Sequence, residues 1–378
     1  MDKYGRFVTL WVKSGPDEKP ASGMGVCPLW PQTKTRNAGG GPAQIWKIPC
    51  GEHDAGRRNE CIKIMSTASM IINAKSSRNA SLADDLLYVT KRHADIRPYV
   101  LERIEDLVPA LEDIEKGDSK TLILAGGDGT MQAAITNAIN RRRFQTQPDY
   151  VALPCGMTNV IANDCGLHGP PATSLDNFLW RRGRGEVSRL ERPLIGMQLS
   201  ERQDPIYGFF LGAGLFHTAV QFSRQNVQTM GAKRSLALAL SVGGFVLKSA
   251  FDNFQGPPPL SAEVRDNGGA FEQRDLSFIA MTTLSKLSAG IFPFWGDGAD
   301  PMSVTAIDYP RRRLLQAALP ILRGQSKPWF AEAGYHSWKS REMRLRFDGP
   351  VVFDGEIFHT APGEDLILKV SEKAAFLI

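Results

Sequence analysis

The residues with the clearest chemical potential form a glycine-rich run, Gly126-Gly127-Asp128-Gly129-Thr130. It follows an apolar segment, residues 122–125, and precedes residues 131–139, whose apolar side chains have helical spacing. Glycine lets a ligand approach the backbone closely. The first N–H groups of a helix lack intrahelical partners and carry partial positive charge. The run therefore indicates a phosphate site, with Thr130 as a hydroxyl donor, although a tight strand-to-helix turn remains the alternative. Asp128 would act through Mg²⁺ and water, or by fixing the loop.

A second glycine turn follows the next apolar segment, residues 150–153. Gly156 opens this turn, and Thr158 and Asn159 can bond a ligand or cap the helix that follows. In a doubly wound sheet, ligands bind outside the carboxyl ends of neighbouring strands. The two glycine turns therefore predict one shared site, with simple helix capping as the alternative for Thr158 and Asn159.

Two acidic turns could add carboxylates to such a site. Asp354-Gly355-Glu356 lies between two short apolar runs, so it is also a strong signal for a plain hairpin turn. A glycine between two acids allows a sharp turn that directs both carboxylates to one side. Asp297 and Asp300 lie in a second turn and have the oxygen ligands that Mg²⁺ prefers, although a solvated turn explains them equally well.

The elements that must position these residues fall into three parts. Residues 1–60 are expected to form a poorly ordered extension, because residues 14–42 are rich in Gly and Pro and show no hydrophobic period. Residues 61–190 alternate between strand and helix patterns, which is typical of a doubly wound α/β domain. The expected strands are 70–72, 96–101, 122–125 and 150–153, and the expected helices are 82–89, 104–114 and 131–139.

Residues 191–378 change to a strand-rich pattern. The expected strands are 193–199, 206–210, 276–282, 302–307, 343–347 and 366–370, and the expected helices are 235–251 and 312–322. The predicted fold class is thus α/β, with an N-terminal doubly wound nucleotide-binding domain followed by a β-rich, β-sandwich-like domain. The phosphate site is expected in the cleft between them, and the last strand and tail are allowed to return to the first domain.

The composition excludes several classes of protein. The chain has 378 residues, 42% of them hydrophobic and 22% charged, as in ordinary globular proteins. Its five cysteines form no CxxC pair, which argues against a disulfide framework or a structural zinc site. The longest apolar stretch, residues 236–247, is shorter than the roughly 20 residues that span a bilayer. We therefore expect a cytoplasmic protein, with any membrane contact limited to the inner membrane surface.

Four motifs together resemble the diacylglycerol kinase family of lipid kinases, which is related to sphingosine kinases and NAD kinases. Gly126 to Thr130 resembles the family's Gly-Gly-Asp-Gly-Thr loop, and Asp354 to Glu356 its Asp-Gly-Glu. Asn73 to Ser77 resembles its Asn-Pro-x-Ser-Gly loop. Leu153 to Ala162 resembles its Leu-Pro-x-Gly-Thr-x-Asn-Asp-Phe-Ala loop. All four occur in the family's order, so the resemblance covers residues 68–378.

The resemblance implies an ATP-dependent kinase that transfers the γ-phosphate to a hydroxyl of diacylglycerol or a similar lipid. The implied ATP-binding residues are Asn73, Ser76, Gly126, Gly127, Asp128, Gly129, Thr130, Gly156, Thr158 and Asn159. The implied catalytic base is Glu356, followed by Asp354 and then Asp128. Mg²⁺ is the implied metal, and Asp297 is its first candidate ligand because its turn resembles a magnesium-binding stretch of bacterial relatives.

The sequence departs from the family pattern at six positions near these loops, and Ala74 and Ser77 replace Pro and Gly in the first of them. Gln132 and Ala133 replace Asn and Glu, Met157 replaces Thr, and Val160 replaces Asp. Two alternatives therefore stay open, a kinase of a soluble substrate such as NAD and a nucleotide- or lipid-binding regulator without catalysis. No nucleic-acid partner is expected, and a homodimer is allowed.

Three basic runs are candidates for contact with anionic lipid headgroups. They are Arg141 to Arg143, Arg181 to Arg184 and Arg311 to Arg313. Each is also explained as the solvated end of a helix, where positive charge is favourable. The apolar residues 236–247 are explained either as a core helix or as part of a slot for an acyl chain.

Overall fold

The computed structural model describes residues 68–75, 81–93, 95–117, 119–141, 144, 146–156, 158–218, 220, 258–287 and 290–378. The extension expected over residues 1–60, the helix expected over residues 235–251, Ser76 and Met157 lie outside these residues. Residues 63–378 form one compact unit.

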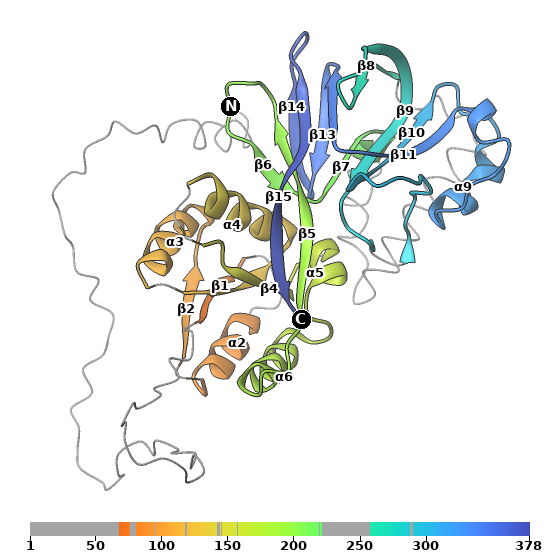
Figure 1. Ribbon diagram of the computed structural model, residues 1–378. Coiled ribbons are helices and arrows are strands. Elements are labelled where there is room, and N and C mark those ends of the chain that lie inside the picture. The colour runs from red at the N-terminus through yellow and green to blue at the C-terminus, as the bar shows by residue number, and fades with distance from the viewer. Residues whose placement is uncertain are drawn as a thin grey trace, which may run out of the picture. The chain divides into compact units, whose positions relative to one another are not determined.

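The first part of this unit is a parallel sheet with strand order β2-β1-β3-β4 (Figure 1). Its strands are β1 (Ala68–Asn73), β2 (Ile96–Leu101), β3 (Thr121–Gly126) and β4 (Asp149–Pro154). Its helices are α2 (Leu82–Thr90), α3 (Leu107–Lys116), α4 (Asp128–Asn140), α5 (Val160–Cys165) and α6 (Pro171–Gly183), and a 3-10 turn (Ile104–Asp106) precedes α3.

Both faces of this sheet are buried, and β3 shows how. Leu122 and Leu124 pack in one cluster with α3, α4 and α5, whereas Ile123 and Ala125 pack in another with α2 and α6. Successive side chains of a strand point to opposite faces, so a strand covered on both sides needs a continuous apolar run. The run at residues 122–125 therefore reflects helices on both faces of the sheet.

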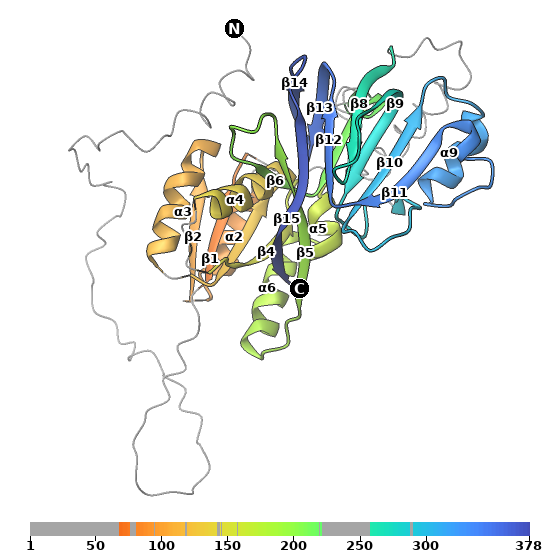
Figure 2. The same cartoon turned by 45° about the horizontal axis from the view of Figure 1, so that its top comes forward.

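The second part is rich in strands. They are β5 (Arg189–Gln198), β6 (Ile206–Gly208), β7 (Phe210–Gly214), β8 (Leu260–Asp266), β9 (Glu272–Thr282), β10 (Met302–Asp308), β11 (Tyr335–Ser340), β12 (Glu342–Arg346), β13 (Gly349–Phe353), β14 (Glu356–Thr360) and β15 (Leu366–Leu377). One helix, α9 (Leu314–Leu322), lies beside β10 and β11, and a 3-10 turn (Ala331–Ala333) precedes β11 (Figure 2). The strands that the structure describes in this part enclose a core of their own.

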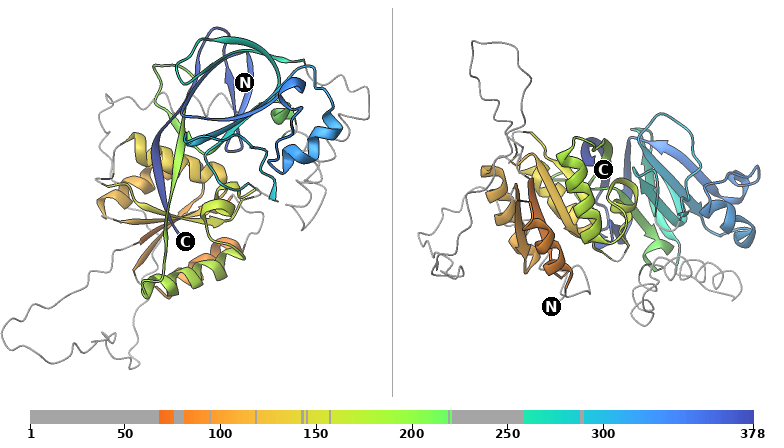
Figure 3. Two further views of the ribbon diagram at one scale, coloured as in Figure 1. Left: turned by 45° about the vertical axis from the view of Figure 1, so that its right-hand side comes forward. Right: turned by 90° about the horizontal axis from the view of Figure 1, so that it is seen from below.

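Two long strands connect the two parts. β5 and β15 pair antiparallel along almost their whole length, from Ile367 opposite Gln198 to Leu377 opposite Arg189. Figure 3 shows them side by side, one green and one dark blue. β15 pairs with β12 near its start and with β4 near its end, where Phe376 lies opposite Tyr150. One hydrogen-bonded sheet therefore runs through both parts.

This architecture confirms the predicted fold class, a parallel sheet with helices followed by a strand-rich part. The sequence patterns missed α6, β8 and β11, and the single strand expected at 206–210 covers β6 but only the first residue of β7. Cys155 and Cys165 are free and buried. No helix in the described part of the chain is long and apolar enough to cross a membrane.

Candidate functional site

The two glycine turns meet at the carboxyl ends of β3 and β4. Gly126 is aligned with Pro154 in the parallel ladder, so the residues that follow each strand become neighbours. A Cβ placed on Gly156 would lie 2.6 Å from the Cα of Gly127, closer than real Cβ contacts allow. The first loop leads directly into α4, whose N-cap is Gly127. Glycine is therefore required here by the close approach of two backbones at a helix N-terminus.

Asp128, a residue of the first loop, forms hydrogen bonds with residues of the second loop. Its carboxylate accepts hydrogen bonds from the hydroxyl of Thr158 at 2.7 Å, from the N–H of Val160 at 3.1 Å and from the N–H of Ile161 at 3.0 Å. The side chain is buried, and burial raises the pKa of its carboxyl above the ordinary value. Asp128 thus satisfies the first N–H groups of α5 and fixes the second loop against the first.

Two further side chains fix the backbone around the loops. The amide of Asn73, at the end of β1, donates to the hydroxyl of Thr130 at 2.9 Å. The N–H of Gly156 donates to the side-chain oxygen of Asn159 at 2.7 Å, and Asn159 adopts a left-handed backbone conformation with φ of 50°. Three parallel strands therefore contribute residues to one edge of the sheet.

Asp354 is the buried acid of the Asp-Gly-Glu turn. Its two carboxylate oxygens accept the N–H groups of Phe209 and Phe210, each at 2.9 Å. Burial, with a smaller contribution from the nearby charge of Asp128, raises the pKa of this carboxyl to about 7 against the opposing effect of the two backbone N–H bonds. Asp354 itself has a φ of 45°, so the turn between β13 and β14 takes the left-handed conformation typical of tight hairpins.

Glu356, the second acid of this turn, is exposed and lies against the first glycine loop. A Cβ placed on Gly129 would lie 3.0 Å from Oε1 of Glu356. The hairpin reading of Asp354 to Glu356 is thus correct for the backbone, because β13 and β14 pair around the turn. The same turn also brings a carboxylate to the N-terminus of α4. Sequence order alone could not reveal this contact, because Gly129 and Glu356 are 227 positions apart.

Helix α4 connects the glycine loop to the strand-rich part along its length. Gln132 is buried and makes long contacts with Phe353 O and Asp354 Oδ2, at 3.4 and 3.5 Å. One turn later, the hydroxyl of Thr136 donates to Tyr207 O at 3.1 Å and accepts from Tyr207 N at 2.9 Å. Sequence reasoning treated Gln132 only as a departure and did not single out Thr136. The available signal for these contacts was the presence of polar residues on a helix that is otherwise apolar.

Asp297 lies in an exposed turn of the strand-rich part, ahead of β10. Its turn packs on β11, where a Cβ on Gly296 would lie 2.3 Å from the Cα of Trp338. Residues that pair across neighbouring strands form a row from Trp338 on β11, through β10, β9, β7 and β13, to Glu356 on β14. This row crosses five spacings between neighbouring strands. Neighbouring strands are about 4.8 Å apart, which gives roughly 24 Å along the sheet. Among the residues that the structure describes, no three His, Cys, Asp or Glu side chains group to hold a metal ion.

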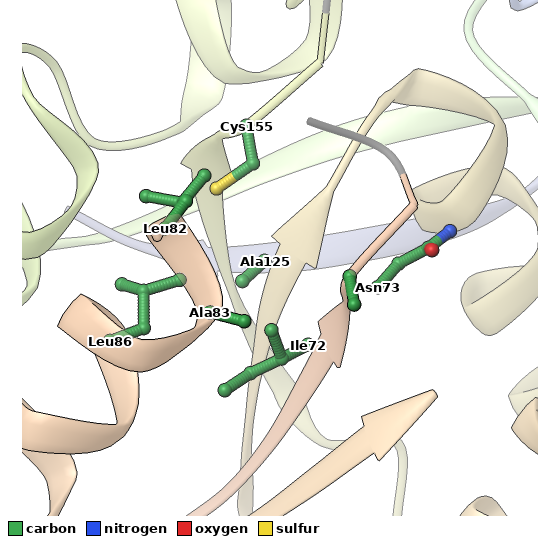
Figure 4. A pocket seen from close by; sticks show the side chains of 8 residues that line it. Ile72, Asn73, Leu82, Ala83, Leu86, Ala125 and Cys155 are labelled. Atoms are coloured by element: carbon green, nitrogen blue, oxygen red, sulfur yellow. The ribbon is translucent and has the colours of Figure 1, made fainter. Parts of the chain in front are cut away.

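A small pocket of about 10 Å³ lies beside Asn73, on the face of the sheet covered by α2 (Figure 4). Apolar side chains of α2, including Leu82 and Leu86, face Ile72 and Cys155 across it. That volume is about the least that holds one water molecule, so the pocket has no room for a nucleotide base. A phosphate group would instead meet the glycine loops at the N-terminus of α4.

Comparison with known proteins agrees with this geometry. Residues 67–186 match the family profile of the diacylglycerol kinase catalytic domain. No curated protein matches the sequence. Among solved structures, a diacylglycerol kinase from Bacillus anthracis str. Sterne shares 11% identity with a TM-score of 0.55, over 82% of this chain and 96% of that one. A candidate diacylglycerol kinase from the same strain shares 12% identity with a TM-score of 0.56, over 82% and 94%. These structures share the fold, and residues 67–186 match the catalytic domain of the diacylglycerol kinase family, in agreement with the resemblance that the sequence motifs predicted.

Proposed function

We propose that the protein is an ATP-dependent lipid kinase that phosphorylates a hydroxyl of diacylglycerol or of a similar lipid. The observation that carries the proposal is the contact between Glu356 and Gly129, which places an exposed carboxylate at a glycine loop suited to phosphate. Phosphoryl transfer needs a phosphate cradle, a divalent cation and a group that accepts the proton of the attacking hydroxyl. The catalytic domain over residues 67–186 supports the kinase class.

In this proposal the two glycine loops hold the phosphates of ATP. Gly126 to Thr130 present the N-terminus of α4, and Gly156 to Asn159 form the opposite wall. Asn73 orients the hydroxyl of Thr130. Ser76 belongs to the same loop in the family resemblance and keeps its proposed ATP contact. Mg²⁺ would be bound by the nucleotide phosphates with one or two carboxylates, which is its usual arrangement in kinases, and it would neutralise phosphate charge.

The three acids have different roles in this proposal. As the lipid hydroxyl oxygen bonds to the γ-phosphorus, the bond from that phosphorus to the β–γ bridging oxygen breaks and ADP leaves. The proton of the hydroxyl passes to the carboxylate of Glu356, which is the exposed acid at the loop. Asp128 and Asp354 are positioning residues, because their oxygens already accept backbone N–H groups. Asp297 takes no proton in this step and keeps its proposed role as a ligand of Mg²⁺. We also propose a cytoplasmic location.

The test is an assay of the full chain with labelled ATP and lipids in detergent micelles. The panel holds diacylglycerol, monoacylglycerol, ceramide and sphingosine, with NAD as a soluble acceptor. We expect label in a lipid product with the wild type and almost none with Glu356→Gln. Glu364→Gln, which changes another exposed acid, is the matched control and should keep full turnover. Nucleotide binding by thermal shift should be the same in all three proteins.

One observation favours a second candidate, a nucleotide-binding regulator without catalysis. Ala133 and Val160 occupy positions where the family has acids, and both pack against the apolar cluster around α3 and α4. They therefore supply no carboxylate near the loops. An ATP-dependent thermal shift, with no turnover of any acceptor and no effect of Glu356→Gln, would select the regulator. Turnover of NAD alone would select a soluble-substrate kinase.

A further inference from the structure

The outer face of helix α9 exposes large apolar side chains. Leu315 and Leu319, one helical turn apart, are 47% and 54% exposed, and Tyr309 just before the helix is 47% exposed. In the described part of the chain only three other large hydrophobic side chains are comparably exposed. Single exposed apolar residues are normal on protein surfaces, but a cluster on one helix face is typical of an interaction surface.

The opposite face of α9 is firmly packed. Ala317 and Ile321 are buried with Phe330 and Tyr335 in a small cluster beneath the helix. The hydroxyl of Tyr335 donates to Arg312 O at 2.7 Å, which fixes the start of the helix to β11. Figures 1 and 2 show α9 next to β10 and β11. The helix is therefore apolar on both faces but buried on only one, which indicates a second apolar partner for the outer face.

The residues around α9 are strongly basic. The α9 segment, defined as residues 309–331, contains five basic and no acidic residues. The basic residues are Arg311, Arg312, Arg313, Arg323 and Lys327. Among the residues that the structure describes, none of the five pairs with a carboxylate. The segment therefore combines exposed apolar side chains with uncompensated positive charge.

The other two basic runs differ in this respect. Arg141 lies 3.8 Å from a carboxylate oxygen of Glu112. Arg182 pairs with Asp95 at 2.9 Å, and Arg184 pairs with Glu186 at 2.6 Å. These arginines already have acidic partners within the chain, so they are explained as ordinary surface residues. Of the arginines of these runs that the structure describes, Arg311, Arg312 and Arg313 have no carboxylate partner, so they can bind an external anion.

A second exposed apolar patch lacks the positive surplus. Tyr88 on α2 and Trp180 on α6 are 67% and 61% exposed. Their arginine neighbours are accompanied by Asp84, Asp85 and Asp176, and Asp176 forms an ion pair with Arg92 at 2.6 Å. This patch is therefore electrically mixed, and it offers an internal control for the α9 segment.

We propose that the α9 segment is a docking surface for an anionic phospholipid bilayer. Leu315 and Leu319 enter the boundary between headgroups and acyl chains, and the flanking arginines bind lipid phosphates. An interfacial helix combines these two features, an apolar face and basic residues at its margin. The positive charge complements the negative surface of the bilayer, where each Lys or Arg contributes to binding. This surface is separate from the glycine loops, so the inference does not depend on the proposed function.

The test is co-sedimentation of the full chain with phospholipid vesicles, without nucleotide. One set contains phosphatidylcholine alone, and the other contains phosphatidylcholine mixed with phosphatidylglycerol. We expect binding to the mixed vesicles only, and weaker binding at high salt because surface charges are screened. This experiment measures no turnover, so a failure to bind vesicles leaves the kinase proposal intact. A failure to phosphorylate lipids likewise leaves the membrane-docking proposal intact.

Two variants separate the apolar and the electrostatic contributions. Leu315→Ser with Leu319→Ser should lower the vesicle partition coefficient about tenfold. Arg311→Gln, Arg312→Gln and Arg323→Gln together should lower it about a hundredfold, at about fivefold for each charge. Tyr88→Ser with Trp180→Ser is the control and should bind as the wild type does. Both α9 variants should keep the wild-type thermal unfolding temperature and any turnover of a short-chain, micellar substrate.

Four results would overturn the proposal. The first is equal binding of the wild type to both kinds of vesicle, or binding to neither. The second is unchanged binding of either α9 variant. The third is an equal loss in the Tyr88 and Trp180 control. The fourth is a role for the leucine pair within the protein or between its copies. That role would appear as a lowered unfolding temperature of the Leu315 and Leu319 variant, or as a wild-type dimer in light scattering that this variant dissociates.

Discussion

The glycine loops have carboxylates in two different environments, one buried within the protein and one exposed to solvent. Asp128 and Asp354 are buried, and every oxygen that they present accepts a backbone or side-chain donor. Glu356 is exposed beside Gly129. A carboxylate that is fully used as an acceptor holds backbone segments in place, whereas an exposed one can exchange a proton with a ligand. The role of each acid in this protein is therefore decided by its surroundings and not by its residue type.

The sharpest test of this comparison is Glu356→Gln. Loss of a general base lowers kcat by about a hundredfold to ten-thousandfold, while the free energy of unfolding should change by less than about 0.5 kcal/mol, as for other exposed sites. Steady-state kinetics and urea denaturation measure the two quantities. A large loss of stability with normal kcat would reverse the roles that we assign to the buried and exposed acids.

Asp128→Ala should have the opposite profile. Removing the carboxylate leaves the hydroxyl of Thr158 and the N–H groups of Val160 and Ile161 without their acceptor. Each unsatisfied buried donor costs about 1–3 kcal/mol, so we expect the free energy of unfolding to fall by about 3 kcal/mol in urea denaturation. Asp297→Ala, at an exposed turn, is the control and should change it little. A loss below about 1 kcal/mol would contradict the positioning role.

Two glycine substitutions extend the comparison to the backbone. Gly156→Ala places a methyl group 2.6 Å from the Cα of Gly127, so it should lower the free energy of unfolding by about 2 kcal/mol. The added methyl group of Gly129→Ala would lie 3.0 Å from Oε1 of Glu356, at the flexible end of that side chain. It should leave stability almost unchanged but reduce kcat about tenfold by displacing that carboxylate. Equal destabilisation by both substitutions in thermal and urea unfolding would remove the distinction.

The smallest expected effect is the pH dependence contributed by Asp354. Its folded-state pKa is about 7, above the ordinary value of 3.8. Between these values the folded state holds the proton more tightly than the unfolded state. This contribution to stability is therefore present below the ordinary value and is lost as the pH rises through about 7.

Urea unfolding between about pH 6 and pH 7 should show the wild type losing about 1 kcal/mol relative to Asp354→Asn. The variant keeps one acceptor oxygen for Phe209 or Phe210 but has no titrating proton. Asp297→Asn is the matched control and should run parallel to the wild type. Parallel curves for the wild type and Asp354→Asn would show that this carboxyl does not titrate in the range.

The local parts of the site could be predicted from sequence, because local patterns determine them. The apolar run 122–125, the glycines after it and the helical spacing of residues 131–139 correctly predicted β3, the turn and α4. The paired runs around Asp354 likewise indicated the β13–β14 hairpin. The approach of Glu356 to Gly129 could not be predicted from spacing, since it depends on the pairing of β13 with β7 and on α4 packing against β6.

Other elements escaped prediction because tertiary contacts outweigh local pattern. β11 carries His336, Ser337 and Lys339, which do not form an apolar run, and it is held by pairing with β10. β8, by contrast, alternates apolar and polar residues, which is the usual pattern of a half-buried strand, so its signal was present and was missed. The family resemblance correctly predicted the catalytic domain, although the acids lost at Ala133 and Val160 leave the acceptor to experiment.

The pairing of β15 with β4 sets an order in which the protein can be completed during synthesis. β4 gains its second neighbour only when residues near Phe376 have emerged, more than two hundred positions after Tyr150. Until then one edge of the parallel sheet presents unpaired backbone groups, which other extended chains can recruit. We therefore expect nascent chains that stop before β15 to depend on chaperones and to be sensitive to proteases, even though the glycine loops and most of their supporting helices are already made.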